Sequence, residues 1–180
     1  HTAPSRAIIA DLNSRLYGFY LQVKNNPGEL HSGIVEIADE FNGTEGPDKQ
    51  AFYLSLRSKY NQSPRDSFES AVLLYALNKL CFNGLYRENS KGGFNVPFGK
   101  KKQLQYLDEK ELRSVSLALK DTLILNADFE TTIGHAKRGD FVYLDPPYIP
   151  IDATSSFTSY HSDGFGIEEQ VRLALAMLKM

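Results

Sequence analysis

The sequence has little of what secreted and membrane proteins depend on. Its 180 residues contain a single cysteine, Cys81, which excludes a disulfide framework. No apolar run reaches the roughly 18 residues that a membrane-spanning helix needs, and the amino terminus does not read as a signal peptide. We therefore expect a soluble, cytoplasmic protein without a membrane partner.

The sequence also has few histidines and a small net charge. The four histidines, His1, His31, His135 and His161, stand apart at spacings that do not fit a metal site, so we predict no metal. The formal net charge of -2 gives no overall reason to expect a polyanionic partner. A nucleic-acid surface would have to come from local clustering of basic residues.

The chain does contain enough apolar material for a folded core. Hydrophobic residues make up 42% of the sequence and aromatic residues 12%, which excludes a disordered chain and suits one globular domain, with or without an insertion. The stretch "AIIADLN" at residues 7–13 predicts a strand ending at Asp11, followed by a helix capped by Asn13 or Ser14. The stretch "TLIL" at residues 122–125 predicts another strand.

Between these two strands the sequence is mainly helical. Apolar residues recur at three- and four-residue spacing, for example at Ala71, Leu74 and Leu77. Clusters of Asn, Gly and Pro separate the periodic segments. The pattern predicts five helices, over residues 16–25, 29–42, 47–60, 64–80 and 108–119.

Residues 82–102, "FNGLYRENSKGGFNVPFGKKK", differ from the helices around them. Two short arms flank Ser90–Gly93, where glycine permits a positive φ, so we predict a β-hairpin. Between residues 79 and 102 six basic residues stand against one acid, Glu88, and such a cluster can neutralise DNA phosphates. Asn83 and Arg87 have side chains suited to adenine and guanine edges. The alternative is a charged, solvated hairpin without a ligand.

The stretch "FVYLDPPYIP", residues 141–150, ends an apolar run with an acid, two prolines and a tyrosine. The pattern predicts a short strand over Val142–Leu144, buried on both faces of a parallel sheet. The prolines end its ladder at Asp145. The strand end then offers the Asp145 carboxylate, the Pro146 carbonyl and the Tyr148 ring, which suit a planar ring bearing an amine. A plain proline-rich surface turn is the alternative.

Taken in order, these motifs resemble the Dam-type (class D12) DNA adenine N6-methyltransferases. The resemblance covers nearly the whole chain and is carried by "IIADLN", "CFNGLYRENSKGGFNVPFGK", "ADF", "DPPYIP" and "ATSSFTSYHSDGF". It implies an α/β fold in which residues 1–15 and 120–180 form parts of a Rossmann-like methyltransferase sheet. Residues 16–119 would be an inserted, mainly helical target-recognition domain that carries the hairpin.

The resemblance also implies an activity. It is the transfer of a methyl group from S-adenosylmethionine to the 6-amino group of a flipped adenine in double-stranded DNA, without a metal. Together with Asn83 and Arg87, it favours a GATC-like target site.

The resemblance implies a role for each matching residue. Asp11 would bind the cofactor's ribose, while Asp128 and Phe129 would border its adenine. The catalytic motif would consist of Asp145, Pro146, Pro147 and Tyr148, with Asp145 also beside the cofactor. Lys100, Lys101 and Lys102 stand where the family often has Arg-Tyr-Lys, so we expect phosphate contacts there in place of a tyrosine contact. The residues matching the DNA-entering hairpin are Phe82, Asn83, Leu85 and Arg87.

Two other classes of protein stay open at this point. Asp11 alone would also suit a NAD-type or other small-molecule Rossmann enzyme, and the hairpin alone would suit a DNA-binding relative or fragment without catalytic activity.

We further expect these 180 residues to be a fragment. Only ten residues precede Asp11 and none of them is glycine, which leaves no place for a glycine-rich cofactor turn. Residues 167–180 read as an apolar-striped helix with no strand after it. Binding of S-adenosylmethionine by the isolated chain is expected to be weak or absent.

Overall fold

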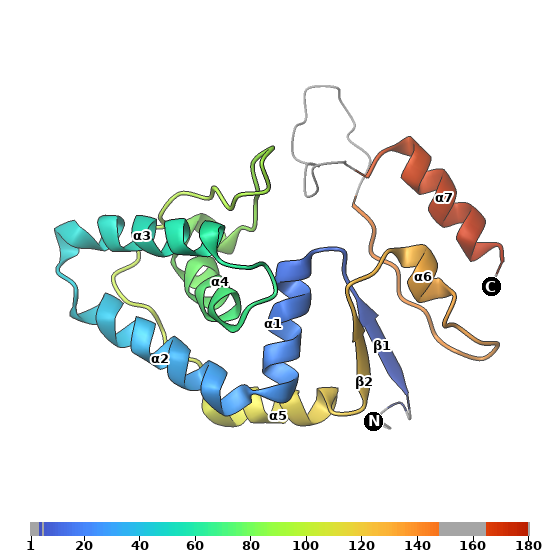
Figure 1. The fold of residues 1–180 in the computed structure, drawn as a ribbon, viewed down its shortest axis with the longest axis horizontal. Helices are drawn as coiled ribbons and strands as arrows, with labels where there is room; N and C mark the ends of the chain where they lie inside the picture. The colour runs from blue at the N-terminus through green and yellow to red at the C-terminus, as the bar shows by residue number, and fades with distance from the viewer. Residues whose placement is uncertain (1–3, 5, 148–164, 180) are drawn as a thin grey trace.

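A computed structural model describes residues 4, 6–147 and 165–179. Helices α1 to α5 lie to one side of a small sheet, and α6 and α7 lie to the other (Figure 1). The elements in chain order are β1 (Ala7–Ala10), α1 (Ser14–Asn25), α2 (Pro27–Gly43), η1 (Gly46–Asp48), α3 (Lys49–Gln62), α4 (Phe68–Leu80), η2 (Phe82–Gly84), α5 (Glu109–Leu119), β2 (Thr122–Leu125), α6 (Phe129–Ile133) and α7 (Ile167–Met177).

The predicted mixture of helices and strands is confirmed at this level. All five helices predicted between the two strands form, with shifts at their ends. The largest shift is at α4, which begins at Phe68 and not at residue 64, because the Ser67 side chain caps it by accepting a hydrogen bond from the Ser70 amide. Asn13 caps α1, as predicted.

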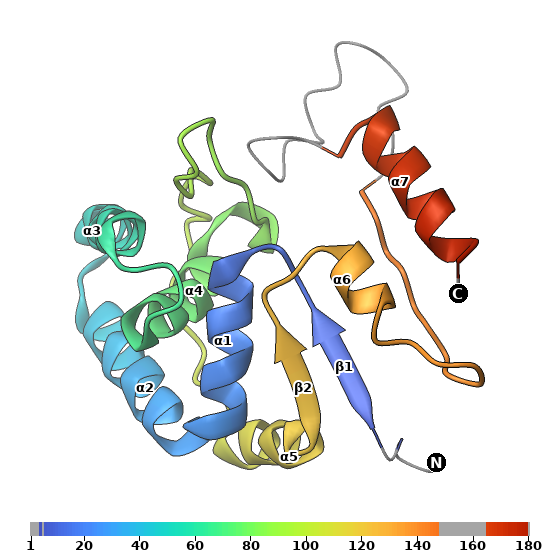
Figure 2. The same ribbon diagram turned by 45° about the vertical axis from the view of Figure 1, so that its right-hand side comes forward.

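Within the described residues the sheet consists of β1 and β2, which lie side by side in Figure 2. They pair in parallel, with Ala7 opposite Thr122 and Ala10 opposite Leu125. Because the strands run the same way, their carboxyl ends meet at one edge. Asp11, which follows β1, extends the pairing by donating its amide to the Leu125 carbonyl at 3.2 Å.

The predicted strand at Val142–Leu144 was wrong. Residues 141–147 have no regular secondary structure, and Phe141 and Tyr143 are 89% and 76% exposed, so the segment is not buried on both faces. A strand needs a neighbouring backbone to bond to, and no strand lies beside this segment in the described part of the chain. Leu144 instead packs against a small cluster of Ile133, Leu173 and Ala176.

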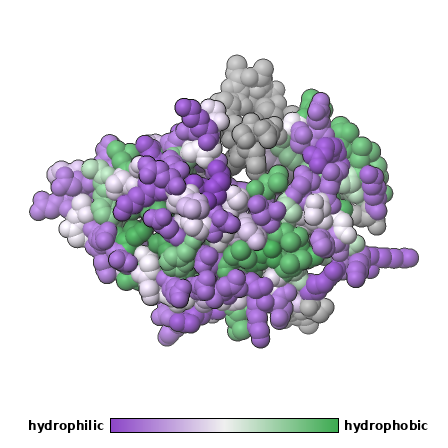
Figure 3. All heavy atoms as spheres, in the orientation of Figure 1, coloured by the Kyte–Doolittle hydropathy of each residue, from purple (hydrophilic) through white to green (hydrophobic). Residues whose placement is uncertain are grey.

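Helix α7 is apolar on two faces. Leu173 and Ala176 are buried against α6, as the apolar stripe in the sequence predicts. Other large side chains on the helix are at least half exposed, and hydrophobic surface is visible over α7 at the right of Figure 3. Those exposed side chains are Ile167, Val171, Leu175, Met177 and Leu178.

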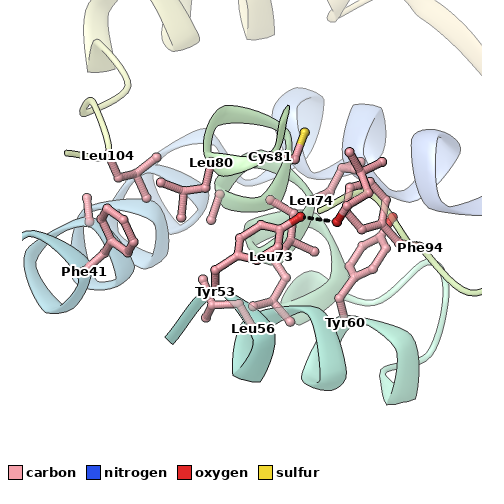
Figure 4. Packing of buried hydrophobic residues seen from close by; sticks show 14 residues of the cluster. Phe41, Tyr53, Leu56, Tyr60, Leu73, Leu74, Leu80, Cys81, Phe94 and Leu104 are labelled. Carbon is pink, nitrogen blue, oxygen red and sulfur yellow. Dashed lines mark hydrogen bonds between the residues drawn. The ribbon is translucent and has the colours of Figure 1, made fainter. Parts of the chain in front are cut away.

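The main core lies between α2, α3, α4 and the segment that follows α4 (Figure 4). Full burial of large side chains of this kind stabilises the fold by about 1.5–3 kcal/mol each. Cys81 belongs to this core, and burial raises the pKa of its thiol. The largest fully buried members are Phe41 from α2, Tyr53 and Tyr60 from α3, Leu77 and Leu80 from α4, and Phe94, Val96 and Leu104 after it.

The predicted hairpin forms, but few backbone hydrogen bonds join its two arms. Its arms meet in two antiparallel bridges, Cys81 with Phe98 and Glu88 with Phe94. At its tip the Asn89 amide donates to the Gly93 carbonyl at 2.8 Å, and Gly92 has a φ of +73°. The rest of the segment has no neighbouring strand among the described residues, so its backbone groups need other partners.

Asparagine side chains from the helices supply two of those partners. The Asn61 side chain accepts from the Phe94 amide at 2.8 Å and donates to the Phe94 carbonyl at 3.1 Å. Asn42 makes the same pair of bonds with Leu104, also at 2.8 and 3.1 Å. One carboxamide thus satisfies both backbone groups of a buried residue, as an adjacent strand would.

A buried tyrosine supplies another partner. The Tyr53 hydroxyl donates to the Val96 carbonyl at 2.8 Å, the dashed line in Figure 4. Arg57 donates to the same carbonyl at 3.2 Å. Burial is also the main reason why the pKa of Tyr53 is raised, so the hydroxyl stays protonated and able to donate.

We predict that Asn61→Ala lowers the free energy of unfolding by about 1–3 kcal/mol, because it leaves the buried amide and carbonyl of Phe94 without partners. Urea denaturation measures the change. Gln62→Ala is the matched control, since Gln62 is exposed on the same helix and bonds only to Ser58 among the described residues. An equal loss of unfolding free energy in the two variants would contradict the stabilising role of the Asn61–Phe94 hydrogen bonds.

Candidate functional site

The carboxyl end of β1 holds Asp11 in a fixed loop. One carboxylate oxygen of Asp11 accepts from the Asn13 amide at 2.7 Å, and Asn13 in turn caps α1 by accepting from the Arg15 amide at 3.0 Å. No described residue bonds the other carboxylate oxygen of Asp11. That oxygen is available to accept a hydroxyl of a ligand.

Asn126 ties the ends of the two strands together. Its side-chain nitrogen donates to the carbonyls of Asp11 at 2.9 Å and Leu12 at 3.0 Å. Asn126 follows β2 directly, so this amide fixes the loop after β1 to the loop after β2. The structure thereby brings Asp11 to the sheet edge from which Asp128 and Phe129 follow.

Asp128 and Phe129 begin α6, and an arginine from α7 covers them. The Asp128 carboxylate caps α6 by accepting from the Glu130 amide at 2.8 Å. Arg172 lies 3.4 Å from that carboxylate and 2.7 Å from the Glu130 carboxylate, with its guanidinium 5.0 Å from the centre of the Phe129 ring. The hydrogen bond to Glu130 is the main reason why the pKa of Arg172 is raised.

The segment that carries Asp145 is held by the same helix. Gln170 donates to the Pro147 carbonyl at 3.0 Å. Asp145 is exposed, and among the described residues nothing donates to the Pro146 carbonyl. Tyr148 lies outside the described residues. Within the described part of the chain, the Asp145 carboxylate and the Pro146 carbonyl are thus two acceptors for which no donor is found.

Sequence reasoning missed Gln170 and Arg172. Both lie on α7, where they join Pro147 and Asp128 to one helix. The only signal for them was a pair of polar side chains within an apolar-striped helix, and that pattern does not indicate which distant residues they contact.

The hairpin presents apolar and polar side chains side by side. Phe82 and Leu85 are 51% and 48% exposed, so both present apolar surface to solvent. Between them Asn83 adopts a φ of 54°, and the turn is held by Asn78, which donates to the Gly84 carbonyl at 2.9 Å.

Basic side chains lie along the same segment. Arg87 donates across the hairpin through Nε to the Asn95 side chain at 2.7 Å, and through Nη2 to the Asn95 carbonyl at 3.4 Å. Lys100, Lys101 and Lys102 are exposed and bond to no other described side chain. The tip of the hairpin also presents hydrophilic surface (Figure 3).

The described residues offer neither a metal site nor a membrane span. Within residues 6–147 and 165–179, no three His, Cys, Asp or Glu side chains gather in a way that would hold a metal ion. No helix in the described part of the chain combines the length and apolarity needed to cross a membrane.

Known proteins resemble this chain over almost all of its length. It is 40% identical to the Type II methyltransferase M.MjaIII of Methanocaldococcus jannaschii over 171 residues, which are 94% of this chain and 59% of that protein. It is 40% identical over 176 residues to the Type II methyltransferase M1.LlaDCHI of Lactococcus lactis subsp. cremoris, covering 95% and 60% of the two chains. It is 37% identical over 170 residues to the DNA adenine methylase of Escherichia coli K12, covering 94% and 59%.

The chain therefore spans about three-fifths of the length of these curated relatives. The family match itself extends over residues 1–180 and confirms the resemblance drawn from the sequence motifs. This chain belongs to the D12 class N6 adenine-specific DNA methyltransferase family.

Proposed function

We propose that the protein transfers a methyl group from S-adenosylmethionine to the 6-amino group of adenine in double-stranded DNA. One observation carries the proposal. In a chain of this family, Asp145 is exposed and the Pro146 carbonyl accepts no hydrogen bond from any described residue. Two acceptors side by side are what an exocyclic amine needs.

The residues at the strand ends fit the proposed cofactor. Asp11 has a carboxylate oxygen without a described partner, suited to a ribose hydroxyl. Asp128 and Phe129, after the neighbouring strand, would border the cofactor's adenine. When bound, S-adenosylmethionine supplies an electrophilic methyl group on its sulfonium.

The chemistry asked of the protein concerns the target amine. That nitrogen is a poor nucleophile because its lone pair is delocalised into the ring, and it is unreachable inside a duplex, so the base is flipped out. Tyr148 would stack on the flipped ring. Hydrogen bonds from the amine to Asp145 and to the Pro146 carbonyl would localise the lone pair and stabilise the positive charge that develops on nitrogen.

Neighbouring residues hold those acceptors in place. Proline at positions 146 and 147 fixes φ, and Gln170 anchors the Pro147 carbonyl. The Pro146 carbonyl therefore has little freedom to turn away from the amine.

The hairpin is the proposed DNA reader, within a target-recognition domain formed by residues 16–119. The exposed apolar side chains of Phe82 and Leu85 would wedge into the duplex. Asn83 and Arg87 would contact base edges in a GATC-like site. The phosphate contacts would come from Lys100, Lys101 and Lys102.

One observation favours a second candidate, a DNA-binding relative without catalytic activity. The segment that carries Asp145 pairs with no strand among the described residues, so no strand hydrogen bonds fix the backbone before Asp145. The NAD-type alternative has no support left now that the family is known. Replacing Asp145 separates the two remaining candidates.

We predict that Asp145→Ala lowers the rate of methyl transfer to DNA by about a hundredfold or more and leaves DNA affinity within a few-fold, because the carboxylate acts on the flipped amine and not on phosphates. A filter assay with methyl-labelled S-adenosylmethionine measures the rate. Asp140→Ala is the control, since Asp140 lies close by in sequence and is paired with Arg6 at 2.6 Å. Equal activity of Asp145→Ala and the parent would sink the catalytic assignment.

We predict that Arg87→Ala relaxes sequence preference at one base pair by roughly 1–3 kcal/mol, whereas Lys101→Ala weakens binding to all sequences alike and reduces the salt slope by about one. Titrations of a cognate and a scrambled duplex at several salt concentrations measure both effects. Equal weakening of every sequence by both changes would make Arg87 a phosphate contact only. Thermal melting controls for the loss of the bonds between Arg87 and Asn95.

A further inference from the structure

A nearly buried acid lies on the first arm of the hairpin. The Glu88 side chain is only 10% exposed. Its carboxylate accepts from the Tyr86 hydroxyl and from one guanidinium nitrogen of Arg65, at 2.8 and 3.0 Å to its two oxygens. A carboxylate withdrawn from water to this degree depends on its cation, so the position of Arg65 and that of the hairpin arm are linked.

Arg65 reaches three parts of the molecule at once. It lies in the turn between α3 and α4 and uses each of its nitrogens for a different partner. Besides Glu88, Nη1 donates to the Gly92 carbonyl at the hairpin tip at 3.3 Å. Nε donates to the Ser14 hydroxyl at 3.2 Å. Only the planar fork of an arginine can serve three such directions.

Glycine permits this close approach at the tip. Gly92 has a φ of +73°, and a Cβ placed there would lie 3.1 Å from Nη1 of Arg65. The tip is thus shaped to receive the guanidinium.

The third partner leads to the strand end that holds Asp11. Ser14 is the first residue of α1 and lies three positions after Asp11. Of the two residues between them, Leu12 and Asn13, it is Asn13 that donates its amide to the Asp11 carboxylate, at 2.7 Å. Contacts from Asp11 to the hairpin tip therefore run through Asn13, Ser14 and Arg65 without a gap.

We propose that Arg65 is a positioning residue that couples the hairpin to the Asp11 loop, so that DNA and cofactor strengthen each other's binding. This inference rests on the proposed function, which places DNA at the hairpin and the cofactor at Asp11. The contacts of Arg65 with Glu88, Gly92 and Ser14 hold the hairpin and the start of α1 in one relative position, so a ligand that restrains either place also restrains the other. The second ligand then binds a site that is already ordered, and by linkage the effect is equal in both directions.

The test uses the protein at its natural length and sinefungin, an analogue of S-adenosylmethionine that has no methyl group to transfer. Fluorescence anisotropy gives the affinity for a GATC-containing duplex with and without saturating sinefungin, and the ratio of the two affinities is the coupling factor. For the wild type we expect a ratio of about five or more. For Arg65→Ala we expect a ratio near one.

Two further variants separate coupling from a general loss of structure. Arg65→Lys keeps the charge but not the planar guanidinium, so its coupling factor is also expected near one. Glu88→Gln keeps a hydrogen-bond acceptor, so its coupling factor is expected between one and that of the wild type. Arg113→Ala is the matched control. It removes an exposed arginine that pairs with Glu109 on α5 at 2.6 Å, and its ratio is expected to equal that of the wild type.

The outcomes distinguish this inference from the proposed function. The coupling is overturned, and the proposed function stands, if the wild type binds both ligands but its coupling factor is one. The same holds if Arg65→Ala and Arg65→Lys both keep the coupling factor of the wild type. If the wild type binds neither sinefungin nor DNA, the proposed function fails and the coupling fails with it.

Discussion

The hydrogen bonds of Asn61 and Asn42 to a segment without regular secondary structure are the constraint on which the rest of the helical part depends. Each carboxamide satisfies both backbone groups of a buried residue, Phe94 in one case and Leu104 in the other. A buried backbone group without a partner costs about 1–3 kcal/mol, so the segment could not pack its apolar side chains into the core without these bonds. With them, Phe94, Val96 and Leu104 are buried.

This anchoring leaves other side chains of the same segment facing outward. Because one arm of the hairpin is fixed to α3 through Val96, the backbone that carries the exposed side chains of Phe82, Leu85 and Arg87 is attached to an anchored segment. Binding elements that are ordered in advance lose less conformational entropy when they meet a partner. A helical platform with a side-chain-anchored hairpin thus suits the reading of DNA.

An asparagine plays a similar part at the other end of the molecule. A sheet with β1 and β2 as its described strands offers few bonds to fix the loops at its carboxyl edge. Asn126 supplies them by holding the carbonyls of Asp11 and Leu12. These two hydrogen bonds therefore fix the loop of the proposed cofactor acid, Asp11, beside the loop that leads to the proposed adenine-bordering residues, Asp128 and Phe129.

Local patterns predicted the elements that depend on local forces. The periodicity of apolar residues predicted the helices. The cap of α1 was predicted at Asn13 or Ser14, and it is Asn13, whose partners Arg15 and Leu16 lie within three positions of it. The strand at Val142–Leu144 was predicted wrongly because a strand is made by its neighbour, and the sequence does not indicate where that neighbour lies. The start of α4 was misplaced because Pro64 and Ser67 are both plausible helix starts, and the Ser67 hydroxyl bond decides between them.

The site was predictable only where it is carried by motifs. The family resemblance named Asp11, Asp128 and Asp145, but it gave no sign of the residues that hold their surroundings. Arg172 meets Asp128 across 44 positions of sequence, and Arg65 meets Ser14 across 51. Such contacts depend on how the helices pack against one another, and the periodicity of the sequence does not predict that packing.

The hairpin segment is anchored before DNA arrives, and amide hydrogen exchange of the DNA-free protein tests this most directly. The amides of Phe94 and Leu104 are bonded only through asparagine side chains. We predict that both exchange nearly as slowly as the amide of Leu77, a buried residue of α4. Exchange at the rate of an unstructured chain would show that DNA, and not the helices, orders the segment, and would contradict the account.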